Sequence, residues 1–278
     1  MSKVLTRLRA SLDDLSPVFK RVAQYVLDHP DQAIYHSVTE LAEATHSSEG
    51  SIIRFCQDLG YSGLQEFKLT LAVELSPRQR GGDGRAVEPS HANLMGRLAH
   101  HAAAAMNDTT NLYEPETFQD VARRLVSARR VDVYGVGASG VVAQYYAYKL
   151  LRLGLTVQAF TDLHLGAMSA SNLSGDCVAI GVSSSGSTVD TLQALKAARD
   201  AGAYTVAVTN RMKSPLAKVA DRNLLASPPE SPLTGGDVFA KIGQLLVLEA
   251  LVHLMGEDDG HLKDAVQRTA QVVAEKSL

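Results

Sequence analysis

The chain has only two cysteines, no excess of positive charge and no unbroken apolar run of membrane-spanning length. Cys56 and Cys177 lie far apart in apolar contexts, so we expect two reduced core thiols in a cytoplasmic protein, with neither a disulfide nor a metal site. The longest apolar run, ending at Met255, is interrupted by Glu249 and His253, and the first residues form no apolar signal segment. We therefore expect a soluble protein without a membrane partner.

A segment of proline, glycine and charged residues divides the sequence into two halves of different pattern. Residues 78–89 have no apolar period, which is typical of a linker. Before them, apolar residues recur at three- and four-residue steps, which predicts helices only. After them, two helical stretches are followed by short strands that alternate with helices, which predicts βαβ units.

The predicted fold is therefore an α/β chain of two domains. An all-α domain occupies residues 1–77, and a doubly wound parallel sheet with helices on both faces occupies residues 90–278, with its core at about 120–255. The strands are expected at 131–136, 156–160, 178–182 and 204–208.

The first half contains the spacing of a helix-turn-helix unit. Ser37-Val-Thr-Glu40 reads as a capping box that opens a short helix, and Ser48 caps a second helix after a tight connection. Five apolar residues are expected to lock the two helices together: Leu41, Ala42, Ile52, Ile53 and Phe55.

The second of these helices offers polar residues that suit double-stranded DNA. Ser48, Glu49 and Ser51 lie near its N-terminus, where small side chains can approach base edges, and Arg54 can reach a guanine or a phosphate. The alternative is a small helical bundle for dimer contacts in which the serines only cap helix ends. Charge favours this alternative slightly, because residues 1–80 hold nine lysine and arginine residues against ten aspartate and glutamate residues. Binding must then rely on a locally basic face, for which the candidates are Lys3, Arg7, Arg54 and Lys68.

Two loops in the second half have the composition of an anion site. Val131–Gly140 and Val178–Thr188 each begin as a strand, continue through glycine and hydroxyl residues, and end in a helical pattern. Backbone N–H groups and the helix dipole attract phosphate there, glycine allows close approach, and serine or threonine adds donors. A single serine of this kind is more often a turn or cap residue, but two such loops favour a ligand.

The stretch from Ser47 to Lys68 resembles the helix-turn-helix signature of the RpiR family of bacterial transcriptional regulators, and the two loops resemble the sugar isomerase (SIS) domain of that family. The resemblance implies a DNA-binding regulator of sugar catabolism genes, commonly a repressor, with a phosphorylated sugar as effector and no cofactor. By position, the phosphate would be bound by Gly137, Ser139, Ser183, Ser184, Ser185, Gly186 and Thr188, with Ser184 contributing a backbone N–H.

Two further residues follow the second predicted strand, at the edge where ligands of parallel sheets gather. Asp162 and His164 are candidates for contacts with sugar hydroxyls, although a lone histidine is often structural. We expect a homodimer or homotetramer, in which paired reading helices match a palindromic operator.

Two enzymes remain as alternatives. Gly135-x-Gly-x-x-Gly140, with Asp162 about twenty residues further on, also fits a dinucleotide-binding oxidoreductase. A sugar-phosphate isomerase would need an acid and a base at the substrate, and His164, Glu230 and Glu249 form no recognisable pair. We therefore assign no catalytic residue and expect no enzyme activity.

Overall fold

The computed structural model describes residues 4–75, 94–227, 237–258 and 260–274. The predicted linker at 78–89 lies outside these residues. The chain divides into two compact units, and the first boundary between them falls between Leu98 and Ala99.

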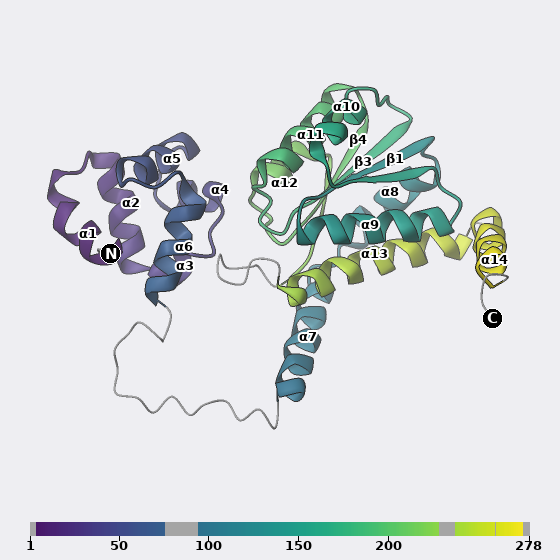
Figure 1. Ribbon diagram of the computed structural model, residues 1–278, viewed down its shortest axis with the longest axis horizontal. Coiled ribbons are helices and arrows are strands. Elements are labelled where there is room, and N and C mark those ends of the chain that lie inside the picture. The colour runs from purple at the N-terminus through teal and green to yellow at the C-terminus, as the bar shows by residue number, and fades with distance from the viewer. Residues whose placement is uncertain (1–3, 76–93, 228–236, 259, 275–278) are drawn as a thin grey trace. The chain divides into compact units, whose positions relative to one another are not determined.

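The first unit is helical throughout its described residues (Figure 1). Its elements are α1 (Val4–Ser11), η1 (Leu12–Asp14), α2 (Pro17–Asp28), α3 (Pro30–Ala33), α4 (Val38–Ala44), α5 (Glu49–Asp58) and α6 (Leu64–Leu75). The capping box of α4 is confirmed, because Ser37 Oγ accepts from Glu40 N while Glu40 Oε2 accepts from Ser37 N. Leu41, Ile52 and Phe55 are buried where α4 and α5 meet the rest of the unit.

One expectation about this core is wrong. Ile53 does not lock α4 to α5, because 41% of its surface is exposed. On α5 the buried residues are Ile52, Phe55 and Cys56, and the step of one residue from Ile52 turns Ile53 away from this side of the helix.

The second unit contains a sheet of five parallel strands in the order β2-β1-β3-β4-β5. The strands are β1 (Arg130–Tyr134), β2 (Val157–Phe160), β3 (Cys177–Val182), β4 (Tyr204–Thr209) and β5 (Arg222–Leu225). The predicted doubly wound sheet is confirmed, and β5 is a strand that the sequence analysis did not predict.

Helices cover both faces of this sheet (Figure 1). One face packs against α8 (Pro115–Val126), α9 (Ala138–Arg152) and α13 (Val238–Asp258). The opposite face packs against α10 (Leu163–Ala170), α11 (Val189–Asp200) and α12 (Pro215–Val219). The remaining helices are α7 (Leu94–Thr110) and α14 (Gly260–Ala274).

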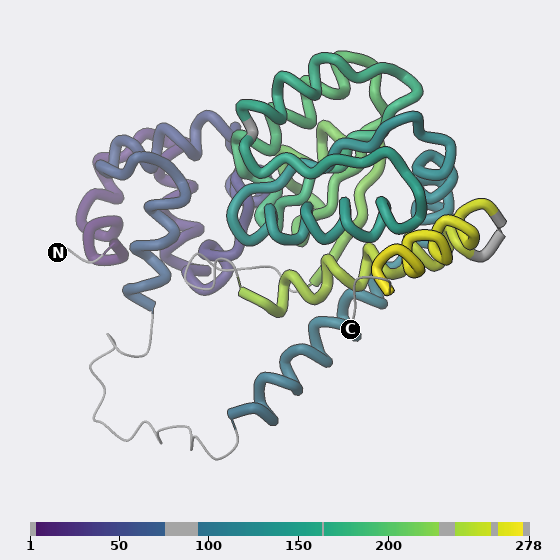
Figure 2. The backbone as a smooth tube through the Cα atoms, turned by 45° about the vertical axis from the view of Figure 1, so that its right-hand side comes forward, coloured from purple at the N-terminus to yellow at the C-terminus, as the bar shows by residue number. Residues whose placement is uncertain are grey.

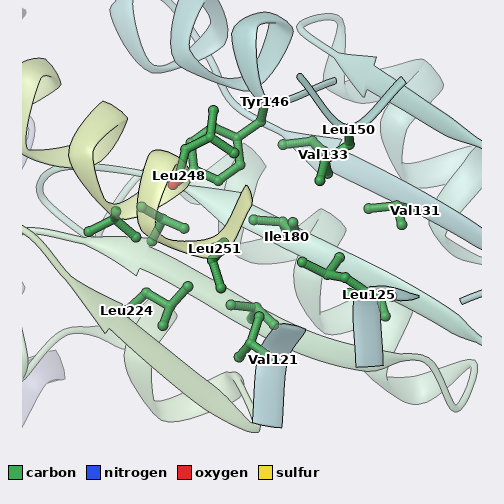
Figure 3. Close-up of a cluster of buried hydrophobic side chains, with 14 of the residues drawn as sticks. Val121, Leu125, Val131, Val133, Tyr146, Leu150, Ile180, Leu224, Leu248 and Leu251 are labelled. Carbon is green, nitrogen blue, oxygen red and sulfur yellow. The ribbon is translucent and has the colours of Figure 1, made fainter. Parts of the chain in front are cut away.

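Successive side chains of a strand point alternately to the two faces of the sheet and so belong to different hydrophobic clusters. On β1, Val131 and Val133 join the first cluster, whereas Tyr134 joins the second. Figure 3 shows the first cluster, in which Ile180 of β3 lies among side chains from α8, α9 and α13.

By length and composition, residues Val238–Gly256 of α13 could cross a membrane, with a mean hydropathy of 1.7. Leu248 and Leu251 of this helix are instead buried against the sheet (Figure 3). Part of its apolar surface therefore belongs to the core, since 39% of the most apolar window of 18 residues is buried.

Candidate functional site

The two predicted loops lie at the point where the direction of chain crossover changes. β1 and β3 are neighbours in the sheet, but the helices that follow them, α9 and α11, cover opposite faces. The carboxyl ends of two such strands open a crevice, which is where ligands bind in doubly wound sheets. The β1–α9 and β3–α11 loops begin at these strand ends.

The first loop requires glycine at its tip. Gly137 has a φ of 57°, a conformation that L side chains rarely adopt, and it is the N-cap residue of α9. Ser139 lies in the first turn of α9, where it is half-buried. The hydroxyl of Ser139 therefore lies at the positive end of the helix dipole, where the N–H groups of Ser139 and Gly140 donate to Val136 O at 3.1 and 3.2 Å.

The second loop is held by its own hydrogen bonds. Ser183 Oγ accepts from Gly186 N at 3.1 Å and lies 3.1 Å from Thr188 Oγ1, while Ser185 Oγ accepts from Ser187 N at 3.2 Å. Gly186 has a φ of 60°, and a Cβ on it would overlap the side chain of Ser214. The hydrogen bonds thus fix the shape of the loop. Glycine is required at position 186 because the backbone has a positive φ there and because a Cβ would overlap Ser214.

A lysine from a third element joins the two loops. The Nζ of Lys241, on the first turn of α13, donates to Ser184 Oγ and lies 3.5 Å from Ser139 Oγ. On the same helix, Gln244 Nε2 donates to Ser184 Oγ at 3.1 Å and to Asn210 Oδ1 at 2.8 Å. Lys241 is only 9% exposed, so its charge acts in surroundings where it is weakly screened.

The arrangement has the chemistry of a site for a phosphate monoester. Two helix starts, several hydroxyls and one ammonium group converge, and all of these favour negative charge. Gln244 Oε1 is buried, with no hydrogen-bond partner among the described residues, so it offers an acceptor beside these donors.

Sequence reasoning missed Lys241, Gln244 and Asn210. Lys241 and Gln244 lie in the apolar segment that forms α13. A lysine is unusual in such a segment, and this was the feature of the sequence that could have indicated a functional residue. The side-chain hydroxyl of Ser184 accepts from Lys241 and Gln244, contacts that the sequence did not predict.

The two residues expected to contact a sugar lie at the start of α10. Asp162 Oδ1 accepts from His164 N at 2.9 Å and from Leu165 N at 3.3 Å, so this carboxylate is the N-cap of the helix. His164 is exposed in the first turn. Their described contacts belong to α10 and do not join them to the cluster around Lys241.

The exposed end of α5 carries most of the predicted DNA-contacting residues. Ser48 Oγ caps the helix by accepting from Ser51 N at 3.1 Å, and it lies 2.9 Å from Ser51 Oγ. Arg54 is exposed, and its Nε donates to Gly50 O at 3.3 Å. These residues form one polar edge at the start of the second helix.

Two other predicted DNA contacts have internal partners. Glu49 Oε1 accepts from Thr39 Oγ1 at 2.6 Å, which ties α5 to α4. Lys68 is only 6% exposed, and its Nζ donates to His36 O at 2.7 Å. Burial removes Lys68 from the candidate DNA contacts, because an ammonium group held against a backbone carbonyl in the core cannot reach a phosphate.

The turn between α4 and α5 is braced by Arg21 of α2. Its guanidinium donates from Nε to Thr45 O at 3.1 Å and from Nη2 to His46 O at 2.9 Å. His46 has a φ of 49°, so the turn depends on a strained residue that Arg21 helps to hold. Of the other basic candidates, Arg7 is exposed on α1, and Lys3 lies outside the described residues.

In comparisons with known proteins, each of the two units matches a known type of domain. Residues 2–78 match a family model described as a helix-turn-helix domain of the rpiR family, and residues 124–254 match the SIS domain. An HTH-type transcriptional regulator of Caldanaerobacter subterraneus is 36% identical over 92% of each chain, and one of Haemophilus influenzae is 33% identical over 99% of this chain and 98% of its own. The structure of the Vibrio vulnificus NanR protein complexed with ManNAc-6P aligns with a TM-score of 0.90, at 35% identity over 98% of each chain.

Proposed function

The chain belongs to the rpiR family of helix-turn-helix transcriptional regulators, and from this membership we propose that a phosphorylated sugar controls its binding to operator DNA. The observation that carries the proposal is the contact of one buried lysine, Lys241, with a serine from each loop, Ser139 and Ser184. Two loops of this composition that meet at a cation are complementary to a phosphate monoester.

The proposed effector is a monosaccharide phosphate, and N-acetylmannosamine 6-phosphate (ManNAc-6P) is the first compound to test, because the related Vibrio vulnificus protein is complexed with it. Its phosphate would be held by the two loops, through Gly137, Ser139, Ser183, Ser184, Ser185, Gly186 and Thr188. The unpartnered Gln244 Oε1 would accept from a sugar hydroxyl. Asp162 and His164 remain candidates for contacts with sugar hydroxyls that lie away from the phosphate.

The DNA-binding surface of the proposal is the exposed edge of α5, with Ser48 and Ser51 near base edges and Arg54 on a guanine or a phosphate. The protein would act in the cytoplasm as a homodimer or homotetramer, so that two reading helices meet the two halves of a palindromic operator. Paired half-sites would compensate for the weak basic charge of each helix-turn-helix unit. We propose repression as the mode of control.

In this proposal the SIS unit binds its ligand without converting it. The two full-length relatives are named as regulators, which supports this choice over an isomerase. Aldose–ketose conversion needs a base within hydrogen-bond reach of the proton it moves. Incubation of the pure protein with pentose and hexose phosphates should therefore leave them unchanged, and steady turnover of any of them would favour the isomerase.

The proposed site is tested by ligand-induced thermal stabilisation. A ligand at one hundred times its Kd should stabilise the native protein by about 2.7 kcal/mol, which raises its melting temperature. The double variant Ser139→Ala, Ser184→Ala should lose this response to ManNAc-6P. Ser171→Ala, which removes an exposed hydroxyl bonded only locally to Met168 O, is the matched control and should keep it. The loop site is refuted if the double variant responds as the wild type does.

A further inference from the structure

Helix α7 is fastened to the sheet unit at its C-terminal end by a buried threonine. Thr109 is only 4% exposed, and its Oγ1 donates to Ala105 O at 2.8 Å. The same oxygen accepts from Ser227 N at 3.1 Å. Ser227 is the second residue after β5, and the residue between them, Ala226, donates its N–H to Thr209 O of β4. One hydroxyl therefore joins α7 to the segment that leaves the sheet.

Helix α13 meets this junction at a glycine. A Cβ on Gly243 would overlap Ser227 O and would lie 2.7 Å from Thr109 Oγ1. Both views show the C-terminal end of α7 beside α13 (Figures 1 and 2). We call Thr109, Ser227 and Gly243 the clasp. Because a Cβ at this position would overlap these atoms, α13 cannot move closer to the junction without displacing the backbone of Ser227 or the end of α7.

The clasp lies within one helical turn of the effector contacts. On α13, Gly243 stands between Lys241 and Gln244, and both of these residues donate to Ser184 Oγ. A phosphate that accepts from Ser184 and from Lys241 would compete with, or add to, the hydrogen bond that these two groups now make. Any resulting shift of Lys241 would arise two residues before Gly243, where α13 is in close contact with Ser227 and Thr109.

Helix α7 is the segment through which the chain enters the sheet unit from the helix-turn-helix half. The first unit extends to Leu98, so α7 begins before that residue and ends at the clasp. A change in the direction of α7 at Thr109 would be carried along this helix of 17 residues to its N-terminal end, which follows the helix-turn-helix unit in the sequence.

We propose that the clasp couples effector occupancy to DNA affinity, with Thr109 and Gly243 as positioning residues that transmit a shift of α13 to α7. The inference rests on the proposed function, since it assigns the route by which that site regulates. Effector binding can change DNA affinity only if the two arrangements of α7 bind the effector unequally. Couplings between sites in proteins typically change affinity by about 5- to 150-fold.

The test compares operator affinity with and without ManNAc-6P, using DNA selected by the protein from a random library. Thr109→Val removes the hydroxyl at nearly constant volume and should bring the ratio of the two operator Kd values close to one, while the Kd for ManNAc-6P without DNA stays near that of the wild type. Thr109→Ser should restore the ratio. Thr110→Val is the matched control, because the Thr110 hydroxyl is exposed and bonds only to Asn107 O within α7.

Glycine variants on α13 give a second comparison. Gly243→Ala should reduce the ratio, whereas Gly256→Ala should not, since a Cβ on Gly256 meets no atom within 4 Å. Hydrogen exchange of the wild type should show that ManNAc-6P changes the protection of amides near Thr109, whatever the stability of the variants.

These experiments distinguish a failure of the proposed function from a failure of the clasp proposal. If the wild type binds ManNAc-6P but its operator affinity does not respond, or if it binds no phosphosugar, the proposed function fails. If the wild type responds and Thr109→Val responds equally, or if exchange near Thr109 is unchanged, the clasp proposal is wrong while the function stands. A role in folding alone would lower the melting temperature of Thr109→Val without changing the ratio.

Discussion

Replacement of Lys241 by methionine tests the cation at the centre of the site. Methionine keeps an unbranched apolar stem but removes the ammonium group that contacts Ser184 and approaches Ser139. A hydrogen bond to a charged group contributes about 1.5–3 kcal/mol. At 1.4 kcal/mol for each factor of ten, the loss corresponds to a Kd for ManNAc-6P weakened about 10- to 150-fold.

Isothermal titration calorimetry with ManNAc-6P measures this change directly. Lys196→Met is the matched control, because Lys196 is exposed on α11, and its removal should leave the Kd unchanged. A Kd for Lys241→Met equal to that of the wild type would refute the role assigned to this residue.

Three further variants test other parts of the molecule. Arg54→Ala should weaken operator binding by about 1–3 kcal/mol in an anisotropy titration if Arg54 reads a base; an unchanged titration would remove it from the interface. Gly186→Ala should abolish ManNAc-6P binding in calorimetry, because its Cβ overlaps Ser214 and its φ of 60° disfavours alanine; normal affinity would show that the loop shape is dispensable. A hydrogen bond from Tyr204 and the charge of Arg222 lower the pKa of Asp120 below its usual value of 3.8. The ionised carboxylate therefore stabilises the folded protein above pH 3.8, and this stability is lost as the pH falls below that value. The difference in melting temperature between wild type and Asp120→Asn should therefore shrink on acidification below that pH, and a difference that grows would contradict this account.

Local sequence signals were sufficient for β1 to β4 and for the loops that follow β1 and β3. Val131 and Val133 on β1, like the valines of β3 and β4, mark buried parallel strands, and the glycine and hydroxyl residues that follow β1 and β3 mark the loops. The order of elements then predicts a doubly wound sheet, and strand order places both loops in one crevice.

Features that depend on tertiary contacts could not be predicted in this way. Lys241 and Ser139 are about a hundred positions apart, and only the packing of α13 on the sheet brings them together. Strand β5 is short and has no β-branched residue, so its pattern is weak and only its pairing with β4 defines it. Lys68 reads as a surface charge, but the fold places it against the carbonyl of His36.

Titration of selected operator DNA with the wild-type protein, in the absence and presence of saturating ManNAc-6P, tests most directly whether the effector controls DNA binding. The two operator Kd values should differ by about 5-fold or more, whereas the double variant Ser139→Ala, Ser184→Ala should have a single operator Kd. Equal values for the wild type under both conditions, at a ligand concentration that calorimetry shows to be saturating, would contradict this control.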